Sequence, residues 1–210
     1  QDAQGIDKIQ KYASLFGLDQ KSGVEIEEMD PHVSDTDAVR SSIGQGTNNY
    51  APVQLARYVT AVANEGTVYQ YTLLNRLEDS DGNVLQTFEP QVRNQIDVLD
   101  TEEWNAIHSG MRMVVENTKE FDGFPIEAAG KTGTAQQNLK RPNHALFVGY
   151  APYDDPEISI ATRIAYGYTS HNAAKLARNV FAYYFNVENE DELLNGQAAN
   201  GNSSSNEISD

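Results

Sequence analysis

The stretch IEAAGKTGTAQQNLKRPNHALFVGYAPYDDPEISIATRIAY, residues 126–166, is the most informative part of this chain for its architecture. It contains three short apolar segments, at Ile126–Thr134, Ala145–Tyr150 and Ile158–Tyr166. Turn-forming residues separate them, with Pro and Asn at 141–143 and Pro and Asp at 152–156. Short apolar runs joined by brief turns are typical of sequential strands that pair with their neighbours. The stretch therefore predicts an antiparallel meander.

The segments on either side of this meander predict helices and a hairpin. Apolar residues recur at helical spacing over four segments: residues 5–16, 52–63, 100–115 and 172–185. Pro52 suits a first helical position, because its missing N–H would have no partner there. Thr67–Leu77 and Val84–Phe88 predict a hairpin, with a turn at 79–83. Helices combined with a sequential antiparallel sheet predict an α+β fold, in which an antiparallel sheet is flanked by helices.

The composition is strongly acidic. Lys and Arg number 15 and Asp and Glu 31, which gives a formal net charge of −16 over 210 residues. Such a chain repels phosphate backbones, so we expect no nucleic-acid partner. The chain has no cysteine, which excludes disulfides and thiolate chemistry, and no apolar run approaches the ~18 residues of a membrane helix. Residues 188–210 contain no Lys or Arg, and we expect a disordered acidic tail there.

The sharpest chemical signal is GKTGTA at residues 130–135, which combines one cation, two hydroxyls and two glycines. Side chains alternate along a strand, so we expect Thr132 and Thr134 on one face and Lys131 on the other. Lysine supplies positive potential, a Thr hydroxyl can donate to a carboxylate, and a backbone N–H can polarise a carbonyl. Gly133 allows a ligand to approach the backbone closely. The strip predicts a site for an anionic, carbonyl-bearing ligand, although an exposed polar strand would have the same composition.

Further segments accompany this strip in the order and with the gaps of a known family. They are SIGQG at 42–46, PVQLA at 52–56, ANEG at 63–66 and HALFVGYAP at 144–152. Together with KTG at 131–133, they resemble the transpeptidase domain of class B penicillin-binding proteins. The resemblance extends from about Gly5 to Phe185. It favours the elongation-type proteins, often called penicillin-binding protein 2, which act in cell shape.

The resemblance implies a fold and an activity. The implied fold is that of serine β-lactamases and D,D-transpeptidases, a five-stranded antiparallel sheet with helices on both sides and the KTG box on an inner strand. The implied activity is peptidoglycan cross-linking. A Ser attacks the D-Ala-D-Ala bond of a stem peptide, an acyl-enzyme forms, and an amine of a neighbouring stem peptide resolves it. β-Lactams acylate the same Ser, and neither a metal nor any other cofactor is implied.

The resemblance also implies roles for four residues. Lys131 is the KTG lysine, which takes part in a proton network and raises the local positive potential. The hydroxyls of Thr132 and Thr134 bind the terminal carboxylate of the donor peptide or of the β-lactam. The Thr134 backbone N–H is one of two oxyanion donors, and Gly133 keeps the strand open to ligand. Lys131 and Thr134 are thus the implied catalytic residues, and residues 132–134 the implied substrate-binding strip.

Two boxes of the family are not found where the chemistry needs them. No Lys has a Ser three residues before it, so S-x-x-K, which carries the nucleophile, is absent from this chain. S-x-N occurs at 170–172 and at 204–206, but both follow the KTG box, whereas the family's S-x-N precedes it. We interpret the first as a helix start and the second as part of the tail. Residues 1–187 are therefore expected to be the C-terminal portion of a transpeptidase domain, inactive without its N-terminal half.

Two other interpretations stay open. A serine β-lactamase uses the same KTG box and would turn penicillin over, and a penicillin sensor or degenerate binding module would bind without catalysis. His32, His108 and His171 lack the spacing of metal ligands, and His144 at a strand start is interpreted as structural. From the resemblance, the protein is expected to be bacterial and to act at the extracytoplasmic face of the cell membrane, held by an anchor that this chain does not contain.

Overall fold

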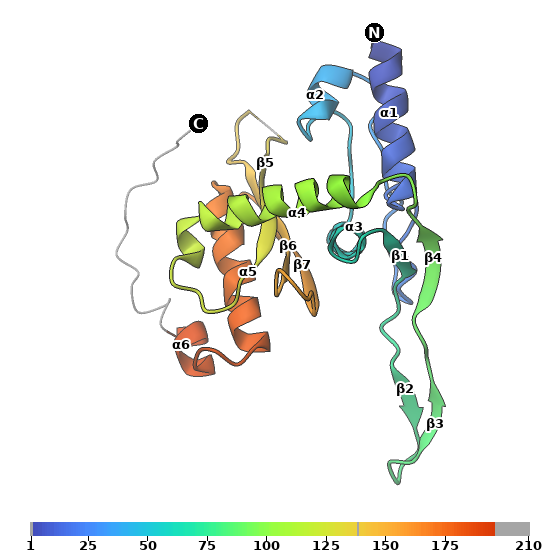
Figure 1. Cartoon of the computed structure of the whole chain (residues 1–210), viewed down its shortest axis with the longest axis vertical. Helices are drawn as coiled ribbons and strands as arrows, with labels where there is room; N and C mark the ends of the chain where they lie inside the picture. Colours follow the sequence, from blue (N-terminus) through green and yellow to red (C-terminus); the bar gives the residue numbers. More distant parts are fainter. Residues whose placement is uncertain (1, 138, 196–210) are drawn as a thin grey trace. The chain divides into compact units, whose positions relative to one another are not determined.

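The computed structural model describes residues 2–137 and 139–195, and it contains the predicted antiparallel meander. Strands β5 (Ala129–Ala135), β6 (His144–Ala151) and β7 (Ile158–Ile164) lie in the order β5-β6-β7 (Figure 1). Their bounds differ from the predicted ranges by only a few residues. The chain divides into two units between His108 and Ser109, and this sheet belongs to the second unit.

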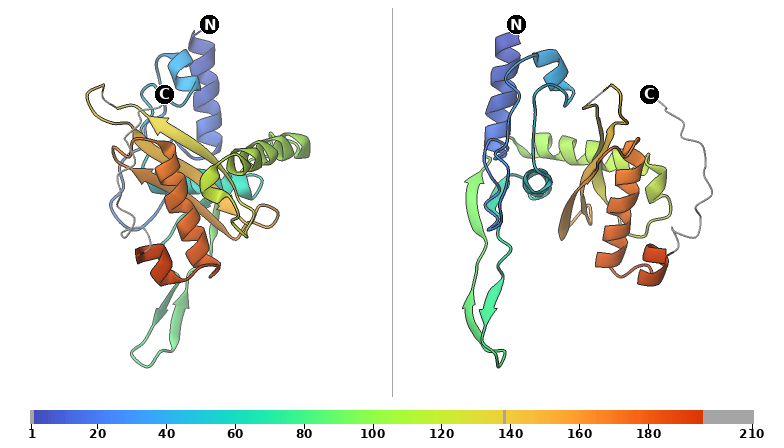
Figure 2. Two further views of the ribbon diagram at one scale, coloured as in Figure 1. Left: turned by 90° about the vertical axis from the view of Figure 1, so that its left-hand side faces the viewer. Right: turned by 180° about the vertical axis from the view of Figure 1, so that it is seen from behind.

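Helix α5 (Ser170–Tyr184) packs against one face of this sheet (Figure 2). Alternate residues of β6 face the helix, and alanines on α5 let the two backbones approach closely. The Oγ1 of Thr162 on β7 donates to the carbonyl O of Ala173 on α5 at 3.0 Å. The α+β class, with a helix packed on an antiparallel sheet, is confirmed. The buried apolar residues of this core are Val115, Phe121, Ala128, Ala145, Phe147, Ala151, Ala173, Ala174, Ala177 and Phe181.

The sheet differs from the five-stranded arrangement that the resemblance implies. Among the described residues it has three strands, and β5 pairs with β6 alone. The KTG strand therefore lies at an edge of this sheet and not on an inner strand. The other strands of the described residues form two separate two-stranded ladders, β1–β4 and β2–β3, so these residues supply only three strands to this sheet.

In the first unit, helices α1 (Asp2–Leu15) and α3 (Pro52–Ala63) are present as predicted, and Pro52 takes the first helical position. Arg57 of α3 is 1% exposed and organises the segment that follows α1. Its Nη1 donates to the carbonyl O of Lys21 at 2.7 Å, and its Nη2 donates to those of Gln20, at 2.8 Å, and Gly17. One buried guanidinium thus satisfies three main-chain acceptors of this turn.

Helix α2 (Ala38–Ser42) lies in the polar segment between α1 and α3, and a tight turn follows it. Gly44 and Gly46 have φ values of 78° and 87°, in the region that favours glycine. A Cβ atom at Gly46 would lie 2.6 Å from Oγ of Ser41 and 2.8 Å from Oγ of Ser34. The GQG segment is therefore a structural turn, in which the second glycine makes room for two buried hydroxyls.

The predicted hairpin is present but is divided into two ladders. The outer ladder pairs β2 (Arg76–Glu78) with β3 (Val84–Thr87), and the inner ladder pairs β1 (Thr67–Gln70) with β4 (Gln91–Gln95). The prediction of one unbroken strand over 67–77 is wrong, because residues 71–75 leave both ladders, and β4 was not predicted. Each ladder contains a register shift, which interrupts the regular pairing.

The turn of this hairpin lies at residues 79–83, as predicted. The Oδ1 of Asp79 accepts from the backbone N–H of Asp81 at 2.9 Å and of Asn83 at 2.8 Å. The Oδ2 of Asp79 accepts from Nδ2 of Asn83 at 2.9 Å. These bonds close the loop on itself, which explains why the DSDGN segment is a turn.

Helix α4 (Thr101–Glu116) is present as predicted and begins with a capping box, and a short 3₁₀ helix, η1 (Lys119–Phe121), follows it. The N–H of Glu103 donates to Oδ1 of Asp100, and the N–H of Asp100 donates to Oε2 of Glu103, both at 2.9 Å. No helix of the described residues is both long and apolar enough to cross a membrane.

The C-terminal part differs from the predicted tail at its start. Residues Glu190–Asn195 form helix α6, within the range 188–210 that the composition predicts to be disordered. Arg178 of α5 forms an ion pair with Glu188, which holds the chain just before α6. Residues 196–210 lie outside the described residues, and for them the tail stays a prediction.

Candidate functional site

The residues of the KTG box follow one another on β5. In the register with β6, Thr132 lies opposite Phe147, and Lys131 lies opposite Val148. Directly opposite residues of an antiparallel pair share a face of the sheet, so Thr132 shares the face that α5 covers. Thr134 follows on that same face, and Lys131 lies on the other. The structure thus brings the two hydroxyls to one face and the ammonium group to the opposite face, as the alternation predicts.

Positive charge gathers around this strand. Residues 128–153 contain Lys131, Lys140 and Arg141 but no Asp or Glu, in a chain with 31 acidic residues. The Lys131 side chain is exposed, and its Nζ donates to the carbonyl O of Thr132 at 2.9 Å. This segment is therefore locally cationic in a chain of net charge −16, which suits an anionic ligand.

The two glycines of the GKTGTA strip differ in how much space their surroundings leave for a side chain. A Cβ atom at Gly130 would lie 2.3 Å from Cζ of Phe147 and 2.7 Å from the carbonyl O of Val148. Its cross-strand partner Gly149 is equally crowded by the Phe147 ring, with Cε1 at 2.7 Å. At Gly133 the nearest atom would be Cβ of Leu146 at 3.5 Å, an ordinary contact. Packing therefore requires glycine at position 130 but not at position 133.

His144 lies at the start of β6 and is 6% exposed. Its Nδ1 accepts from the backbone N–H of Tyr166 at 3.1 Å, and its Nε2 lies 2.7 Å from Oε1 of Gln137. Because Nδ1 accepts, the ring is neutral and donates from Nε2. Burial, and then the nearby guanidinium of Arg163, lower the pKa of His144, which keeps the ring neutral. His144 has the predicted structural role, since it joins the segment after β5 to the segment after β7.

The S-x-N match at 170–172 lies at the start of α5, as predicted, but the cap of this helix is Thr169. The Oγ1 of Thr169 accepts from the backbone N–H of His171 at 3.5 Å. The Nδ2 of Asn172 donates to the carbonyl O of Gly167 at 2.8 Å. These bonds account for the polar residues at this helix start, and they support the interpretation that this match is not a second catalytic box.

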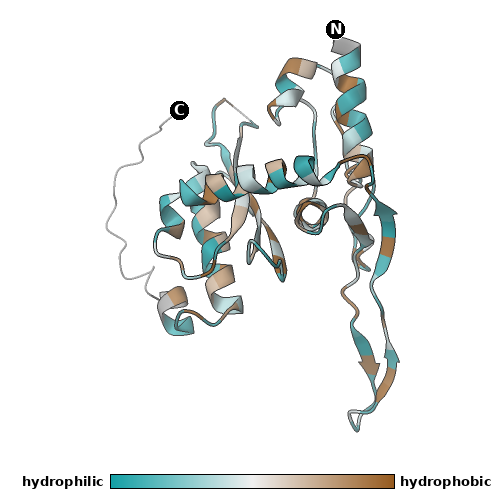
Figure 3. Ribbon diagram, viewed as in Figure 1, coloured by the Kyte–Doolittle hydropathy of each residue, from teal (hydrophilic) through white to brown (hydrophobic). Residues whose placement is uncertain are grey.

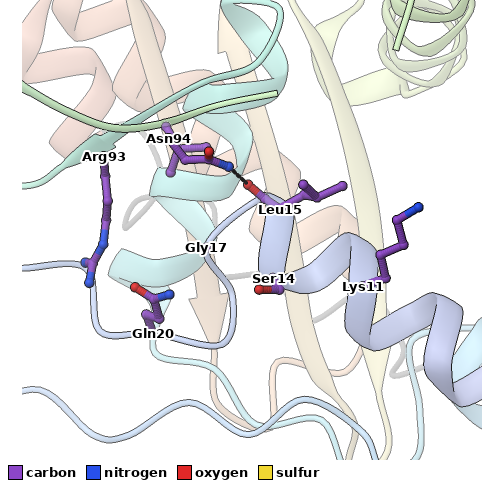
Figure 4. Close-up of a pocket in the computed structure, with 8 residues that line it drawn as sticks. Lys11, Ser14, Leu15, Gly17, Gln20, Arg93 and Asn94 are labelled. Carbon is purple, nitrogen blue, oxygen red and sulfur yellow. Dashed lines mark hydrogen bonds between the residues drawn. The ribbon is translucent and has the colours of Figure 1, made fainter. Parts of the chain in front are cut away.

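The first unit contains a cavity of about 540 Å³ that holds no residue of the KTG box. Its lining includes two cations, Lys11 and Arg93, and no carboxylate. Figure 4 shows that the Lys11 side chain points away from Arg93, and that Nδ2 of Asn94 donates to the carbonyl O of Leu15. The two positive charges do not converge on one point, so we assign no ligand to this cavity.

The sequence does not predict two supports of the KTG strand. One is the crowding of Gly130 by the Phe147 ring, and the other is the link from His144 to Tyr166. Both join residues that are far apart in the chain and meet only through strand register. The one signal that marks them is the HALFVGYAP segment at 144–152, which contains both His144 and Phe147.

The comparisons with known proteins agree with this geometry. The model of the family described as penicillin binding protein transpeptidase domain matches residues 1–182. Peptidoglycan D,D-transpeptidase MrdA of Haemophilus influenzae is 31% identical over an alignment of 218 positions. This alignment covers 87% of this chain and 33% of that protein. Penicillin-binding protein 2A of Bacillus subtilis is 26% identical over an alignment of 226 positions. This alignment covers 95% of this chain and 31% of that protein. The chain thus spans about a third of the length of these relatives.

Solved structures give the same result for the fold. Penicillin-binding protein 2B from Streptococcus pneumoniae has a TM-score of 0.76 and 22% identity, over 87% of this chain and 33% of that chain. Penicillin-binding protein A from M. tuberculosis, in an imipenem acyl-enzyme complex, has a TM-score of 0.76 and 22% identity, over 85% of this chain and 42% of that chain. The chain belongs to the family of penicillin-binding protein transpeptidase domains, and its relatives are class B penicillin-binding proteins.

Proposed function

We propose that this chain is the part of a peptidoglycan D,D-transpeptidase that carries the KTG strand. The observation that carries the proposal is the GKTGTA strip on β5, within a stretch of 26 residues, 128–153, that has no acidic side chain. A stem peptide that ends in D-Ala-D-Ala presents a carboxylate and a scissile carbonyl. The two hydroxyls lie on one face of β5 and the cation on the other, and a twisted strand edge relaxed by Gly133 would let all three reach one ligand bound along that edge.

In the proposed reaction this chain binds the donor peptide and polarises its scissile carbonyl, and a serine outside this chain is the nucleophile. The hydroxyls of Thr132 and Thr134 hold the terminal carboxylate of the donor peptide. The backbone N–H of Thr134 donates to the oxygen that becomes negative when the serine attacks the carbonyl. The carbonyl carbon bonds to the serine oxygen, the terminal D-Ala leaves as the free amine, and an acceptor amine then displaces the serine. Lys131 favours the anionic ligand and takes part in proton transfer.

The proposal also concerns the binding partners and the cellular location of the protein. Peptidoglycan stem peptides are the substrates, and β-lactams are covalent inhibitors that acylate the serine. The remaining N-terminal part of the domain is the intramolecular partner that contributes S-x-x-K and S-x-N. We place the protein at the extracytoplasmic face of the bacterial membrane, because its substrate is cell-wall peptide, with a role in cell shape.

Acylation by a fluorescent penicillin tests the proposal in the complete protein. Lys131→Ala is expected to lower the acylation rate by on the order of 10²-fold, because it removes the positive charge beside the ligand. Lys175→Ala is the matched control, since Lys175 is an exposed lysine of α5. Equal acylation of the Lys131→Ala variant and the control would reject the role of Lys131.

Two further measurements separate the alternatives. The coding sequence upstream of Gln1 should encode S-x-x-K and then S-x-N in frame, and their absence would favour a non-catalytic binding module. The acylated protein should then release the penicillin slowly. Rapid turnover of penicillin would identify a serine β-lactamase-type hydrolase instead.

A further inference from the structure

The dipeptide Asp–Gly occurs twice in this chain, at residues 81–82 and 122–123. Both copies are exposed, and both glycines have a positive φ, 85° at Gly82 and 71° at Gly123. Figure 3 shows hydrophilic segments along the loop between α4 and β5, where the second copy lies. An Asp that precedes Gly can convert to isoaspartate without an enzyme, because glycine has no side chain to shield its backbone nitrogen. The two copies therefore place the same chemistry in two different turns.

In the first copy the glycine N–H already has a hydrogen-bond partner. The backbone N–H of Gly82 donates to the carbonyl O of Asp79 at 3.1 Å, and this bond closes the turn. The backbone N–H of Asp79 donates to the carbonyl O of Asn83 at 3.0 Å. The Asp79 carboxylate in turn accepts from the backbone N–H groups of Asp81 and Asn83. A reaction between the Gly82 nitrogen and the Asp81 carboxyl therefore requires that these bonds open first.

In the second copy the glycine N–H belongs to the central peptide of a type II turn. The backbone N–H of Phe124 donates to the carbonyl O of Phe121 at 3.0 Å, which closes the turn around the dipeptide. Asp122 has φ −58° and ψ 123°, and Gly123 has φ 71°, which are angles of a type II turn. The Gly123 N–H has no hydrogen-bond partner among residues 2–137 and 139–195. Type I and type II turns differ by a rotation of the central peptide, so this peptide can rotate while the bond that closes the turn is kept.

We propose that Asp122–Gly123 is a site of spontaneous isoaspartate formation, whereas the turn at 79–83 protects Asp81–Gly82. The Gly123 nitrogen attacks Cγ of the Asp122 carboxyl group, a C–N bond forms, and the carboxyl hydroxyl leaves as water with the proton of that nitrogen. Water then adds to the main-chain carbonyl carbon of Asp122 in the resulting five-membered ring. The bond from this carbon to the Gly123 nitrogen breaks, so the main chain now runs through Cβ and Cγ of Asp122. One water leaves and one is added, so the composition of the protein is unchanged.

The lengthened main chain acts on the two aromatic residues that flank the dipeptide. Phe121 is buried and stacks on Phe147 at 5.8 Å, and Phe124 packs edge-on against Phe121 at 5.9 Å. An extra main-chain atom between Phe121 and Phe124 disturbs the turn bond that joins them and, with it, this aromatic packing. The Phe147 ring also lies against Gly130, the first residue of the GKTGTA strip. Isoaspartate at position 122 therefore weakens the support of β5, and, on the proposed function, it lowers the rate of penicillin acylation.

Ageing of the complete protein in water labelled with heavy oxygen tests the modification, because a ring that is opened by this water retains the label. Trypsin in ordinary water then releases the two copies in separate peptides, residues 77–93 and 120–131, for mass spectrometry. In the folded protein the peptide 120–131 should take up label about tenfold faster, because the bonds that hold Gly82 must open before the other copy reacts. In urea the two peptides should take up label at similar rates. Equal labelling in the folded protein, or an unchanged difference in urea, would overturn the proposal.

Two variants test the consequence for the KTG strand. Asp122→Glu keeps the charge at an exposed position, but its longer side chain does not form the five-membered ring, and Asp81→Glu is the matched control. With age, the wild type and the control should lose penicillin acylation in proportion to the labelled fraction of 120–131, and Asp122→Glu should retain its initial rate. Equal loss in all three proteins would refute the link to β5. Fresh protein that penicillin does not acylate at all would reject the proposed function, and the labelling would still decide where isoaspartate forms.

Discussion

Substitution of Gly130 by alanine is expected to destabilise the protein through one steric conflict. The new Cβ would lie 2.3 Å from Cζ of Phe147 and 2.7 Å from the carbonyl O of Val148. Carbon atoms in contact prefer about 3.5–4.0 Å, so the ring would have to move by more than an ångström. Phe147 is fully buried, and its ring stacks on Phe121 at 5.8 Å, so the movement would disturb the core.

The magnitude follows from the cost of overpacking. An added methyl in a well-packed core costs about 1–3 kcal/mol, and a contact with a stiff ring and a backbone oxygen belongs at the upper end. We therefore expect Gly130→Ala to lower the free energy of unfolding by about 3 kcal/mol. At Gly133 the nearest atom is 3.5 Å away, so Gly133→Ala should leave stability unchanged or raise it by about 0.5–1 kcal/mol.

Urea unfolding followed by circular dichroism measures both variants. The same pair separates folding from function, because Gly133→Ala should retain the fold but lose β-lactam acylation in the complete protein. The double variant Gly130→Ala with Phe147→Leu should recover stability relative to Gly130→Ala, since leucine has no atom at the Cζ position. Equal unfolding midpoints for Gly130→Ala and Gly133→Ala would refute the steric reasoning.

Three further predictions concern stability. Arg57→Met should lower the free energy of unfolding by about 3 kcal/mol, because three main-chain carbonyls each lose a hydrogen bond from this buried guanidinium; urea unfolding measures it. Asp100→Ala should cost about 1 kcal/mol by removing the cap of α4, and no change in the unfolding midpoint would contradict it. His144 has a pKa below its ordinary value, so the unfolded chain binds its proton at higher pH. The contribution of His144 to the free energy of unfolding should therefore be fully present above pH ~6.5 and decrease as the pH falls below that value. His144→Gln should flatten this pH dependence, and His32→Gln, at an exposed position, should not.

Much of the architecture could be predicted because it depends on neighbours in the chain. The meander at 126–166 follows from apolar runs and turn residues, and the start of α4 follows from two acids three residues apart. The same holds for the turn at 79–83, where Asp79 bonds within its own loop. Errors arise where pairing is irregular: 71–75 leave both ladders, and the register shifts cannot be seen in a local pattern.

The candidate site was predicted in part for a similar reason. The alternation of Lys131 and Thr132 on β5 requires only the two-residue period of a strand. The edge position of β5 and the crowding of Gly130 depend on which strands pair, and no local pattern contains that information.

The amino-acid order alone therefore establishes the strands and helices, the chemistry of the KTG strip and the family, because these depend on residue types at short, regular spacings. The neutral state of His144, the different space around Gly130 and Gly133, and the exposure of the β2–β3 ladder are known only from the folded chain. Each is a property of contacts between residues that are distant in the sequence. Burial, crowding and exposure are set by what the rest of the chain places beside a residue.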